Sequence, residues 1–329
     1  GGDGTGTFID KNVGTNKAVI VSGYTLVGSD AGNYAVGQPT GLTADITPAS
    51  LLVSGLTASN KIYDGTDAAI VNTAGAVLTG LIGGDTVTVS ATGTFSDKNV
   101  GTGKTVTLTS GYGGADAGNY TITDQVSAIA DISSKTLTAS GITANNKVYD
   151  GTGIASLNTG AAGLAGGAAA ADDNKYYTGD AISLDVSSAA GAFADKNVGT
   201  GKVVNVSGLA LTGADAGNYT VSDGSGASAD ITPKSVTVTG LAADNKVYDG
   251  TTDVTISNWG FVVTGVGTET LTLNHGSASF SDKNAGTGKN VTADGYSLGD
   301  GANGGLASNY TLSSTSATTS ADILKKALT

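Results

Sequence analysis

The chain has 329 residues, with 52 Gly, 3 Pro, no Cys and no Met, and its formal net charge is −12. Apart from one His, every basic side chain is a Lys, so the chain lacks the dense cationic surface that binding to nucleic-acid phosphates requires. The absence of Cys excludes disulfides, thiolate nucleophiles and Cys-ligated metals, and no apolar run reaches the 18 residues of a membrane-spanning helix. No basic, apolar secretion signal opens the sequence, and the lack of Met indicates a processed chain or an excerpt.

One sequence unit recurs almost four times along the chain, which predicts a tandem array. It contains four blocks in a fixed order: Lys-x-Tyr-Asp-Gly, Phe-x-Asp-Lys-Asn, Asn-Tyr and Ala-Asp-Ile. The predicted division is a partial repeat over residues 1–48, which matches only the second half of a unit, complete repeats over 49–133, 134–232 and 233–325, and the start of a further repeat at 326–329. We refer to the segments 1–48, 49–133, 134–232 and 233–325 as the first to fourth repeats.

The spacing between blocks separates a constant joint from variable loops. The block tyrosines Tyr63, Tyr149 and Tyr248 each stand 18 positions after the Asp of the preceding Ala-Asp-Ile block. Extra residues fall instead in Gly160–Gly179 of the third repeat and near Gly299–Leu306 of the fourth. Surface loops tolerate insertions cheaply, whereas a joint of fixed length indicates ordered structure and a stiff coupling between repeats.

Alternating apolar residues predict several strands in each repeat, among them one in the joint, one before the recurring Phe and one after Asp-Lys-Asn. The alternating pairs, in chain order, are Val19/Val21, Leu51/Val53, Val87/Val89, Val106/Leu108, Leu137/Ala139, Ile182/Leu184, Val204/Val206, Val236/Val238, Leu271/Leu273 and Val291/Ala293. With six or seven such segments per repeat, the prediction is an all-β tandem array of small antiparallel β-sandwich-like domains joined end to end, anchored by the recurring Tyr and Phe. A parallel β-helix is the competing architecture, although its coils are shorter than this repeat.

Few residues suggest chemistry. Gly101-Thr102-Gly103-Lys104-Thr105 looks like the end of a phosphate-binding loop, but Lys98 stands where that motif needs Gly, so we expect a β-turn. His275 and Trp259 are each single in the chain, which argues against a repeated site. We expect His275 to be a satisfied or exposed strand residue and Trp259 to make local packing or a surface contact. Because the repeats without His cannot host a Ser-His-acid triad, we expect no catalytic residue, no cofactor and no enzymatic activity.

The Asp- and Asn-rich blocks leave alternatives open. Asp10, Asp97, Asp195 and Asp282 are weak calcium candidates, because oxygen ligands recur there, but the Lys between each Asp and the following Asn opposes a cation, so we favour structural turns. Asn119, Asn218 and Asn309 begin Asn-Tyr-Thr, the acceptor pattern for N-glycosylation.

Four aspartates lie between Ala and Ile, where a strand is expected: Asp45, Asp131, Asp230 and Asp322. A carboxylate in such a place must face solvent or find a partner. Lys61, Lys147 and Lys246 recur at a constant interval and are possible partners. The expectation is an exposed charge at a sheet edge or a salt bridge, and the sharper hypothesis is an intramolecular Lys–Asn or Lys–Asp amide bond assisted by an acid.

The Lys-x-Tyr-Asp-Gly-Thr segments at residues 61–66, 147–152 and 246–251, with the three downstream blocks, resemble the YDG repeat, which is related to the mostly-β, glycine-rich (MBG) repeats. Such repeats occur in large bacterial surface and secreted proteins, including filamentous-haemagglutinin-like adhesins. The resemblance covers nearly the whole chain, and the fourth repeat departs from it at Leu306-Ala307-Ser308.

The resemblance implies a non-enzymatic stalk or fibre segment of an extracellular, cell-surface adhesin, which projects a binding region or mediates cell–cell and biofilm contacts. The expected partners are neighbouring repeats, and beyond them surface polysaccharide, another cell or like chains, with no nucleic acid and no insertion into a membrane. Two alternatives are a self-assembling extracellular filament and a glycan-binding module that uses the variable loops, where Tyr176 and Tyr177 are the aromatic residues.

Overall fold

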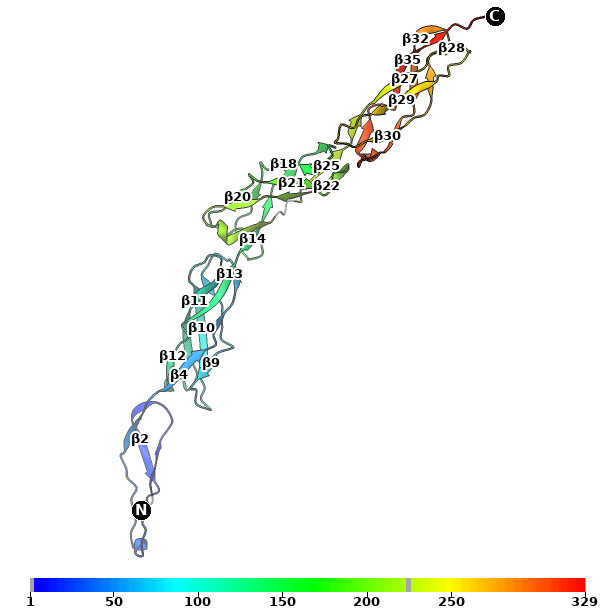
Figure 1. Cartoon of the computed structure of the whole chain (residues 1–329). Coiled ribbons are helices and arrows are strands. Elements are labelled where there is room, and N and C mark those ends of the chain that lie inside the picture. Colours follow the sequence, from blue (N-terminus) through cyan, green and yellow to red (C-terminus); the bar gives the residue numbers. More distant parts are fainter. Residues whose placement is uncertain (1–2, 223–225, 329) are drawn as a thin grey trace. The chain divides into compact units, whose positions relative to one another are not determined.

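The computed structural model describes residues 3–222 and 226–328, and strands joined by turns dominate it (Figure 1). The helical segments in these two ranges are four 3-10 turns, η1 (Ala31–Asn33), η2 (Ala117–Asn119), η3 (Ala216–Asn218) and η4 (Ala307–Asn309). Across the same ranges, no helix has the length and apolar character that crossing a membrane would need. The predicted all-β class is confirmed.

The strands are short and more numerous than the six or seven expected for each repeat, because several are two-residue pairings. The first repeat contains β1 (Thr5–Phe8), β2 (Gly14–Ser22) and β3 (Thr43–Ile46). The second contains β4 (Ala49–Ser54), β5 (Thr57–Ala58), β6 (Lys61–Ile62), β7 (Ala68–Ala69), β8 (Val71–Asn72), β9 (Val77–Thr79), β10 (Thr88–Phe95), β11 (Gly101–Gly113), β12 (Tyr120–Thr123) and β13 (Ser127–Ser133).

The third and fourth repeats follow a similar order of elements. The third contains β14 (Lys135–Ser140), β15 (Thr143–Ala144), β16 (Lys147–Val148), β17 (Ile154–Ala155), β18 (Leu157–Asn158), β19 (Gly163–Leu164), β20 (Ser183–Asp185), β21 (Ala190–Phe193), β22 (Gly199–Ser207), β23 (Ala210–Thr212), β24 (Tyr219–Ser222) and β25 (Ser228–Thr232). The fourth contains β26 (Lys234–Val236), β27 (Val238–Ala243), β28 (Lys246–Val247), β29 (Ile256–Val262), β30 (Leu271–Asn274), β31 (Ala278–Phe280), β32 (Gly286–Asp294), β33 (Ser297–Asp300), β34 (Tyr310–Leu312) and β35 (Ser316–Leu324).

The chain divides into two compact units, each of which is described by itself. The first unit comprises Gly1–Thr136, Gly167–Asp180 and Asp215–Thr220, and the second comprises Leu137–Gly166, Ala181–Ala214 and Val221–Thr329. The two short segments of the third repeat that belong to the first unit therefore pack with the second repeat. Parts of one repeat are therefore built onto the repeat before it.

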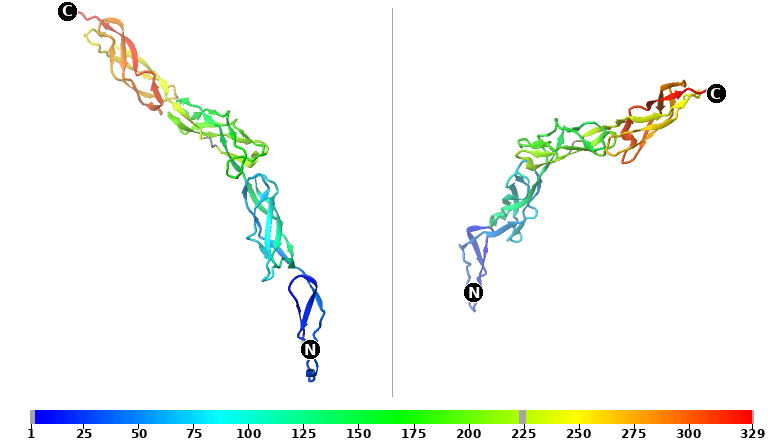
Figure 2. Two further views of the ribbon diagram at one scale, coloured as in Figure 1. Left: turned by 180° about the vertical axis from the view of Figure 1, so that it is seen from behind. Right: turned by 45° about the horizontal axis from the view of Figure 1, so that its top comes forward.

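Each complete repeat has one larger sheet around a long hairpin. In the second repeat its strand order is β6-β13-β11-β10-β7, and Phe95 pairs with Val106 in the antiparallel β10/β11 hairpin. Figure 2 shows these cyan strands running alongside one another in two further views. The third repeat repeats the order as β16-β25-β22-β21-β17, and the fourth as β28-β35-β32-β31.

Parallel pairings complement the predicted antiparallel ones. The edge strand that carries the Lys-x-Tyr block is parallel to the Ala-Asp-Ile strand, as β6 with β13, β16 with β25 and β28 with β35. The Asn-Tyr strand is parallel to the first strand of its own repeat, as β12 with β4 and β34 with β26. These pairs join segments far apart in sequence, so the local alternation could not reveal them.

The alternating apolar residues form the core, as predicted. Val106, Val204 and Val291 occupy equivalent positions and are at most 2% exposed. In the second unit, the core of the third repeat continues through Val236, Val266 and Tyr310, which belong to the fourth. Two successive repeats in that unit therefore share buried apolar surface.

The Gly-Thr-Gly-Lys segment is a β-bulge within strand β11 rather than the expected chain-reversing turn. The pairing of β11 with β13 shifts register between Gly101 and Lys104, so the chain continues in the same direction. Gly103 has φ +59°, and its counterpart in the first repeat, Asn16, has φ 51°. Gly and Asn adopt this left-handed conformation at low cost, which explains the residue types at this position.

The Ala-Asp-Ile aspartates cap this bulge. Oδ1 of Asp131 accepts the Gly103 N–H at 2.7 Å, and Asp45, Asp230 and Asp322 accept the equivalent N–H groups of Asn16, Gly201 and Gly288. Ion pairs of these aspartates with Lys61, Lys147 and Lys246 are wrong, because the ammonium groups of those lysines bind Asp64, Asp150 and Asp249 instead. The amide bond stays an untested hypothesis. The bulge exposes a backbone N–H to each aspartate, and the spacing of residues in the sequence does not show this.

We expect Asp230→Ala to lower the free energy of unfolding of the third repeat by about 1 kcal/mol, since one backbone N–H loses its acceptor at a partly exposed site. Asp230→Asn keeps an acceptor oxygen and serves as the matched control, with a smaller loss. Amide hydrogen exchange of peptides that span β22 and β25 measures the loss of stability in each of the two variants. Equal exchange in Asp230→Ala and the unsubstituted chain would contradict the capping role.

Candidate functional site: the junction between repeats

The Lys-x-Tyr-Asp-Gly-Thr block forms a closed turn that points its Tyr inward. In the second repeat, Oδ1 of Asp64 accepts the Thr66 N–H at 2.9 Å and the Lys61 ammonium at 2.7 Å. The same ammonium also donates to the Thr66 carbonyl and lies 5.3 Å from the centre of the Phe95 ring. The equivalent contacts recur around Lys147 and Lys246. Because the Lys and Asp of the block bind each other, the hydroxyl of the Tyr between them is free to bind a residue of the next repeat.

Polar side chains on the face of one repeat that meets the next repeat contact polar side chains of that next repeat. These faces are defined in space, because their residues are spread along the sequence of each repeat. We call this set of contacts the junction. The outgoing side consists of the Lys and Asn of Asp-Lys-Asn, the residue after that Asn, and the block Tyr. The incoming side consists of one buried carboxylate and the Asn and Tyr of the Asn-Tyr block. The first–second and second–third junctions lie within the first unit, and the third–fourth junction lies within the second unit.

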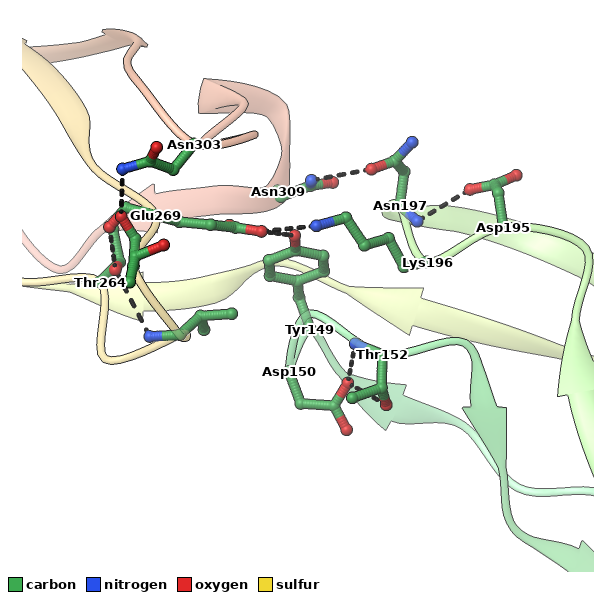
Figure 3. A network of polar contacts seen from close by, with 12 residues as sticks. Tyr149, Asp150, Thr152, Asp195, Lys196, Asn197, Thr264, Glu269, Asn303 and Asn309 are labelled. Atoms are coloured by element: carbon green, nitrogen blue, oxygen red, sulfur yellow. Dashed lines mark hydrogen bonds and ion pairs between the residues drawn. The ribbon is translucent and has the colours of Figure 1, made fainter.

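Glu269, the only Glu of the chain, is the centre of the third–fourth junction (Figure 3). Its side chain is 6% exposed and accepts hydrogen bonds from the hydroxyls of Tyr149 (2.8 Å) and Tyr310 (2.7 Å). The Lys196 ammonium donates to it at 2.6 Å. The two Tyr rings meet edge to face, with centroids 5.4 Å apart. One carboxylate thus ties the outgoing Tyr and Lys of the third repeat to the incoming Tyr of the fourth.

Asp180 has the same position in the second–third junction. It accepts from the hydroxyls of Tyr63 (2.9 Å) and Tyr219 (2.6 Å) and from the Lys98 ammonium (3.0 Å). The rings of Tyr63 and Tyr219 again meet edge to face, at 5.3 Å. In the first–second junction, Asp85 accepts from the Tyr120 hydroxyl at 2.6 Å and pairs with Lys11.

An Asn side chain forms a second link at every junction. Oδ1 of Asn309 accepts the Val198 backbone N–H at 2.9 Å, and its Nδ2 donates to Oδ1 of Asn197 at 3.0 Å. Asn218 makes the same two bonds to Val100 and Asn99, and Asn119 makes them to Val13 and Asn12. The 3-10 turns η2, η3 and η4 end at these Asn residues and so hold each amide at the joint.

The fourth repeat uses its junction residues differently from the others. The Lys11 ammonium lies 2.7 Å from a carboxylate oxygen of Asp116, and the Lys98 ammonium lies 3.7 Å from one of Asp215. The fourth repeat has Leu306 at the position of these two aspartates. The departure from the repeat pattern at Leu306 therefore removes one junction acid. Within the described residues, Glu269 supplies the one carboxylate that pairs with Lys196.

Opposing effects set the pKa of the junction carboxylates. Burial raises the pKa of Glu269, but hydrogen bonds from Lys196, Tyr310 and Tyr149 outweigh burial, and the net pKa lies below 4.5. Asp180 shows the same balance, with hydrogen bonds from Tyr219, Lys98 and Tyr63. Burial, and then the hydrogen bond to Glu269, raises the pKa of Tyr310. The junction is therefore built around a charged carboxylate and neutral Tyr hydroxyls.

This charge state predicts a loss of stability in acid. A carboxyl whose pKa is lowered by folding contributes stability above its unfolded pKa, and the contribution fades as the pH falls below about 4.5. We expect the urea midpoint of the fourth repeat, followed by Trp259 fluorescence, to fall between about pH 5 and pH 3, and the fall to be shallower in Glu269→Gln. An identical pH profile in the two chains would show that other carboxyls control the transition.

The calcium candidates form Asx turns in the structure. Oδ1 of Asp97 accepts the Asn99 N–H at 2.8 Å and the Lys104 ammonium at 2.7 Å, and Asp10, Asp195 and Asp282 have equivalent partners. In residues 3–222 and 226–328, no three His, Cys, Asp or Glu side chains gather closely enough to hold a metal ion. Calcium binding by the chain stays an untested prediction.

The three glycosylation candidates are the junction amides. Asn218 and Asn309 are 4% and 0% exposed, and Nδ2 of each, where a glycan would attach, donates a hydrogen bond. Burial therefore opposes modification of Asn218 and Asn309 once the repeats have folded. Sequence reasoning assigned these Asn residues to turns and glycans and missed their role as links.

The insertion of the third repeat is engaged in packing. Tyr177 meets the Tyr63 ring edge to face at 6.0 Å, and Lys135, with no exposed surface, binds Asp173 at 2.8 Å and the Ala170 carbonyl. Asp180 follows at the end of this segment. The insertion predicted as a surface loop thus delivers a junction acid and contacts within the first unit.

The two single residues pack on each other. The Trp259 and His275 rings are stacked, with centroids 3.6 Å apart and planes 6° apart. The Tyr296 hydroxyl donates to the Trp259 carbonyl at 2.8 Å. The local packing expected for Trp259 is present. His275 is exposed, as expected, but it lies just after β30 and not in a strand. Trp259 is a natural fluorescent reporter for the fourth repeat.

Comparison with known protein families gives one result across nearly the whole chain. The YDG domain matches four times in succession, over residues 2–41, 47–128, 133–227 and 232–319. No curated protein matches the chain.

Proposed function

Since the chain belongs to the YDG domain family through four tandem matches, we propose that it is a structural stalk segment of a bacterial extracellular adhesin. In this role the repeats carry a binding region away from the cell and perform no catalysis. The acidic composition, with a net charge of −12, keeps such an array soluble, and the absence of Cys and Met leaves few side chains open to oxidation.

The observation that carries the proposal is the recurrence of the junction. The polar residues that repeat along the sequence, namely the block Tyr, the Lys and Asn of Asp-Lys-Asn, and the Asn-Tyr pair, hydrogen-bond from one repeat to the next. A stalk requires this use of its recurring residues, because each repeat must resist bending and separation from its neighbours. In an enzyme or lectin array, recurring polar residues would instead converge on an open cleft.

Small-angle X-ray scattering of the full chain tests the proposal. A compact globule of this length would have a radius of gyration of about 20 Å. We expect a value well above that, and a further increase when one more repeat is added. A radius near 20 Å would contradict the stalk function.

A further inference from the structure

The outgoing side of the fourth repeat carries the junction residues, yet the described chain offers them no incoming partner. Tyr248, Lys283, Asn284 and Ala285 stand at the positions of Tyr149, Lys196, Asn197 and Val198. Tyr149 is buried at 1% exposure under the next repeat, whereas Tyr248 is half-buried and Lys283 and Asn284 are exposed. Tyr248, Asn284 and Ala285 line a surface hollow together with Lys325, Lys326 and Leu328.

We propose that this outgoing face, formed by Tyr248, Lys283, Asn284 and Ala285, is a docking site for the incoming end of a further YDG repeat. The partner must present a carboxylate to the Lys283 ammonium and the Tyr248 hydroxyl. It must also present an Asn amide to the Ala285 N–H and the Asn284 side chain. The inference rests on the recurrence of the junction and not on the extracellular role.

The chemistry of the three occupied junctions specifies this partner. Lys11, Lys98 and Lys196 each bind a carboxylate of the following repeat. Lys283 has no such carboxylate within the part of the chain that the structure describes. A partner that lacks a carboxylate would bury the Tyr248 hydroxyl and approach the Lys283 charge without compensating either.

The test appends a second copy of residues 233–325 after residue 324, which keeps the spacing of 18 positions from Asp322 to the block Tyr of the appended copy. Trp259 of the original fourth repeat is changed to Phe, so that the only Trp reports on the appended copy. We expect Lys283→Ala with Asn284→Ala to raise the unfolding equilibrium constant of the appended copy about tenfold to a hundredfold. The same double substitution in the chain without the appended copy should leave the Trp259 transition unchanged.

Labelling of Lys283 with an amine-reactive reagent gives a second measurement in the same chains. We expect the appended copy to slow labelling of Lys283 several-fold and to leave the exposed Lys175 unaffected. The inference is overturned if the appended copy does not shield Lys283, or if its stability does not depend on Lys283 and Asn284. It is also overturned if the unextended chain associates through Lys283, which would assign the face to a second copy. None of these outcomes alters the scattering test of the stalk.

Discussion

Glu269→Ala is expected to destabilise the third–fourth junction more than any other single polar substitution, by about 3 kcal/mol. The change leaves the hydroxyls of Tyr149 and Tyr310 without their acceptor in a buried site and removes the counter-charge of Lys196. Lys196 is 39% exposed and can turn to water, which keeps the expected loss at the lower end for a buried ion pair. Urea unfolding followed by Trp259 fluorescence measures the loss in the fourth repeat.

Two control substitutions separate the charge from the hydrogen bonds. Glu269→Gln keeps an acceptor oxygen for one Tyr hydroxyl, so its cost should be about half as large. Asp244→Ala removes an exposed carboxylate of the same repeat and should change stability by less than about 0.5 kcal/mol. If all three variants unfolded at the same urea concentration, the carboxylate would have no structural role at the junction.

Asn309→Ala is expected to cost about 2 kcal/mol. Asn309 has no exposed surface, and its amide satisfies both the Val198 N–H and the Asn197 side chain. Truncation leaves the part-buried Val198 N–H of the third repeat without its acceptor, so the damage should extend beyond the repeat that carries the substitution. Hydrogen exchange of peptides around residues 196–199, together with the Trp259 transition, measures the effect on both sides of the junction.

Asn33→Ala is the matched control for this prediction. Asn33 occupies the same place in the Asn-Tyr block of the first repeat, but it is exposed and its side chain makes no hydrogen bond to the described residues. We expect no measurable change in stability. A comparable loss for Asn33 and Asn309 would mean that the block stabilises its own turn rather than the junction.

Much of the fold could be predicted from the sequence, because alternation with a period of two is a local signal. It placed residues such as Val106, Val204 and Val291 in the core correctly. The parallel pairs β12/β4 and β6/β13 have no comparable signal in the sequence, because they join distant segments whose register depends on the whole repeat.

The junction was hidden for a related reason. The Asn residues of the junction bind backbone N–H groups that are more than 100 residues away in sequence: 106 for Val13, 118 for Val100 and 111 for Val198. The recurrence of Asp-Lys-Asn and Asn-Tyr was therefore visible in the sequence, but their pairing with each other was not. The acid was harder still to find, because it precedes its Tyr by 35, 39 or 41 residues and changes from Asp to Glu. The only available signal was that Glu269 is the single Glu of the chain.

The central claim is that successive repeats are coupled through the junction, and amide exchange at four equivalent residues tests it most directly. The N–H groups of Val13, Val100 and Val198 each donate to the Asn side chain of the following repeat, whereas Ala285, at the outgoing face of the fourth repeat, has no such acceptor within the described residues. In nuclear magnetic resonance measurements on the intact chain, we predict slow exchange at the three Val amides and fast exchange at Ala285. Equally fast exchange at all four would contradict the coupling.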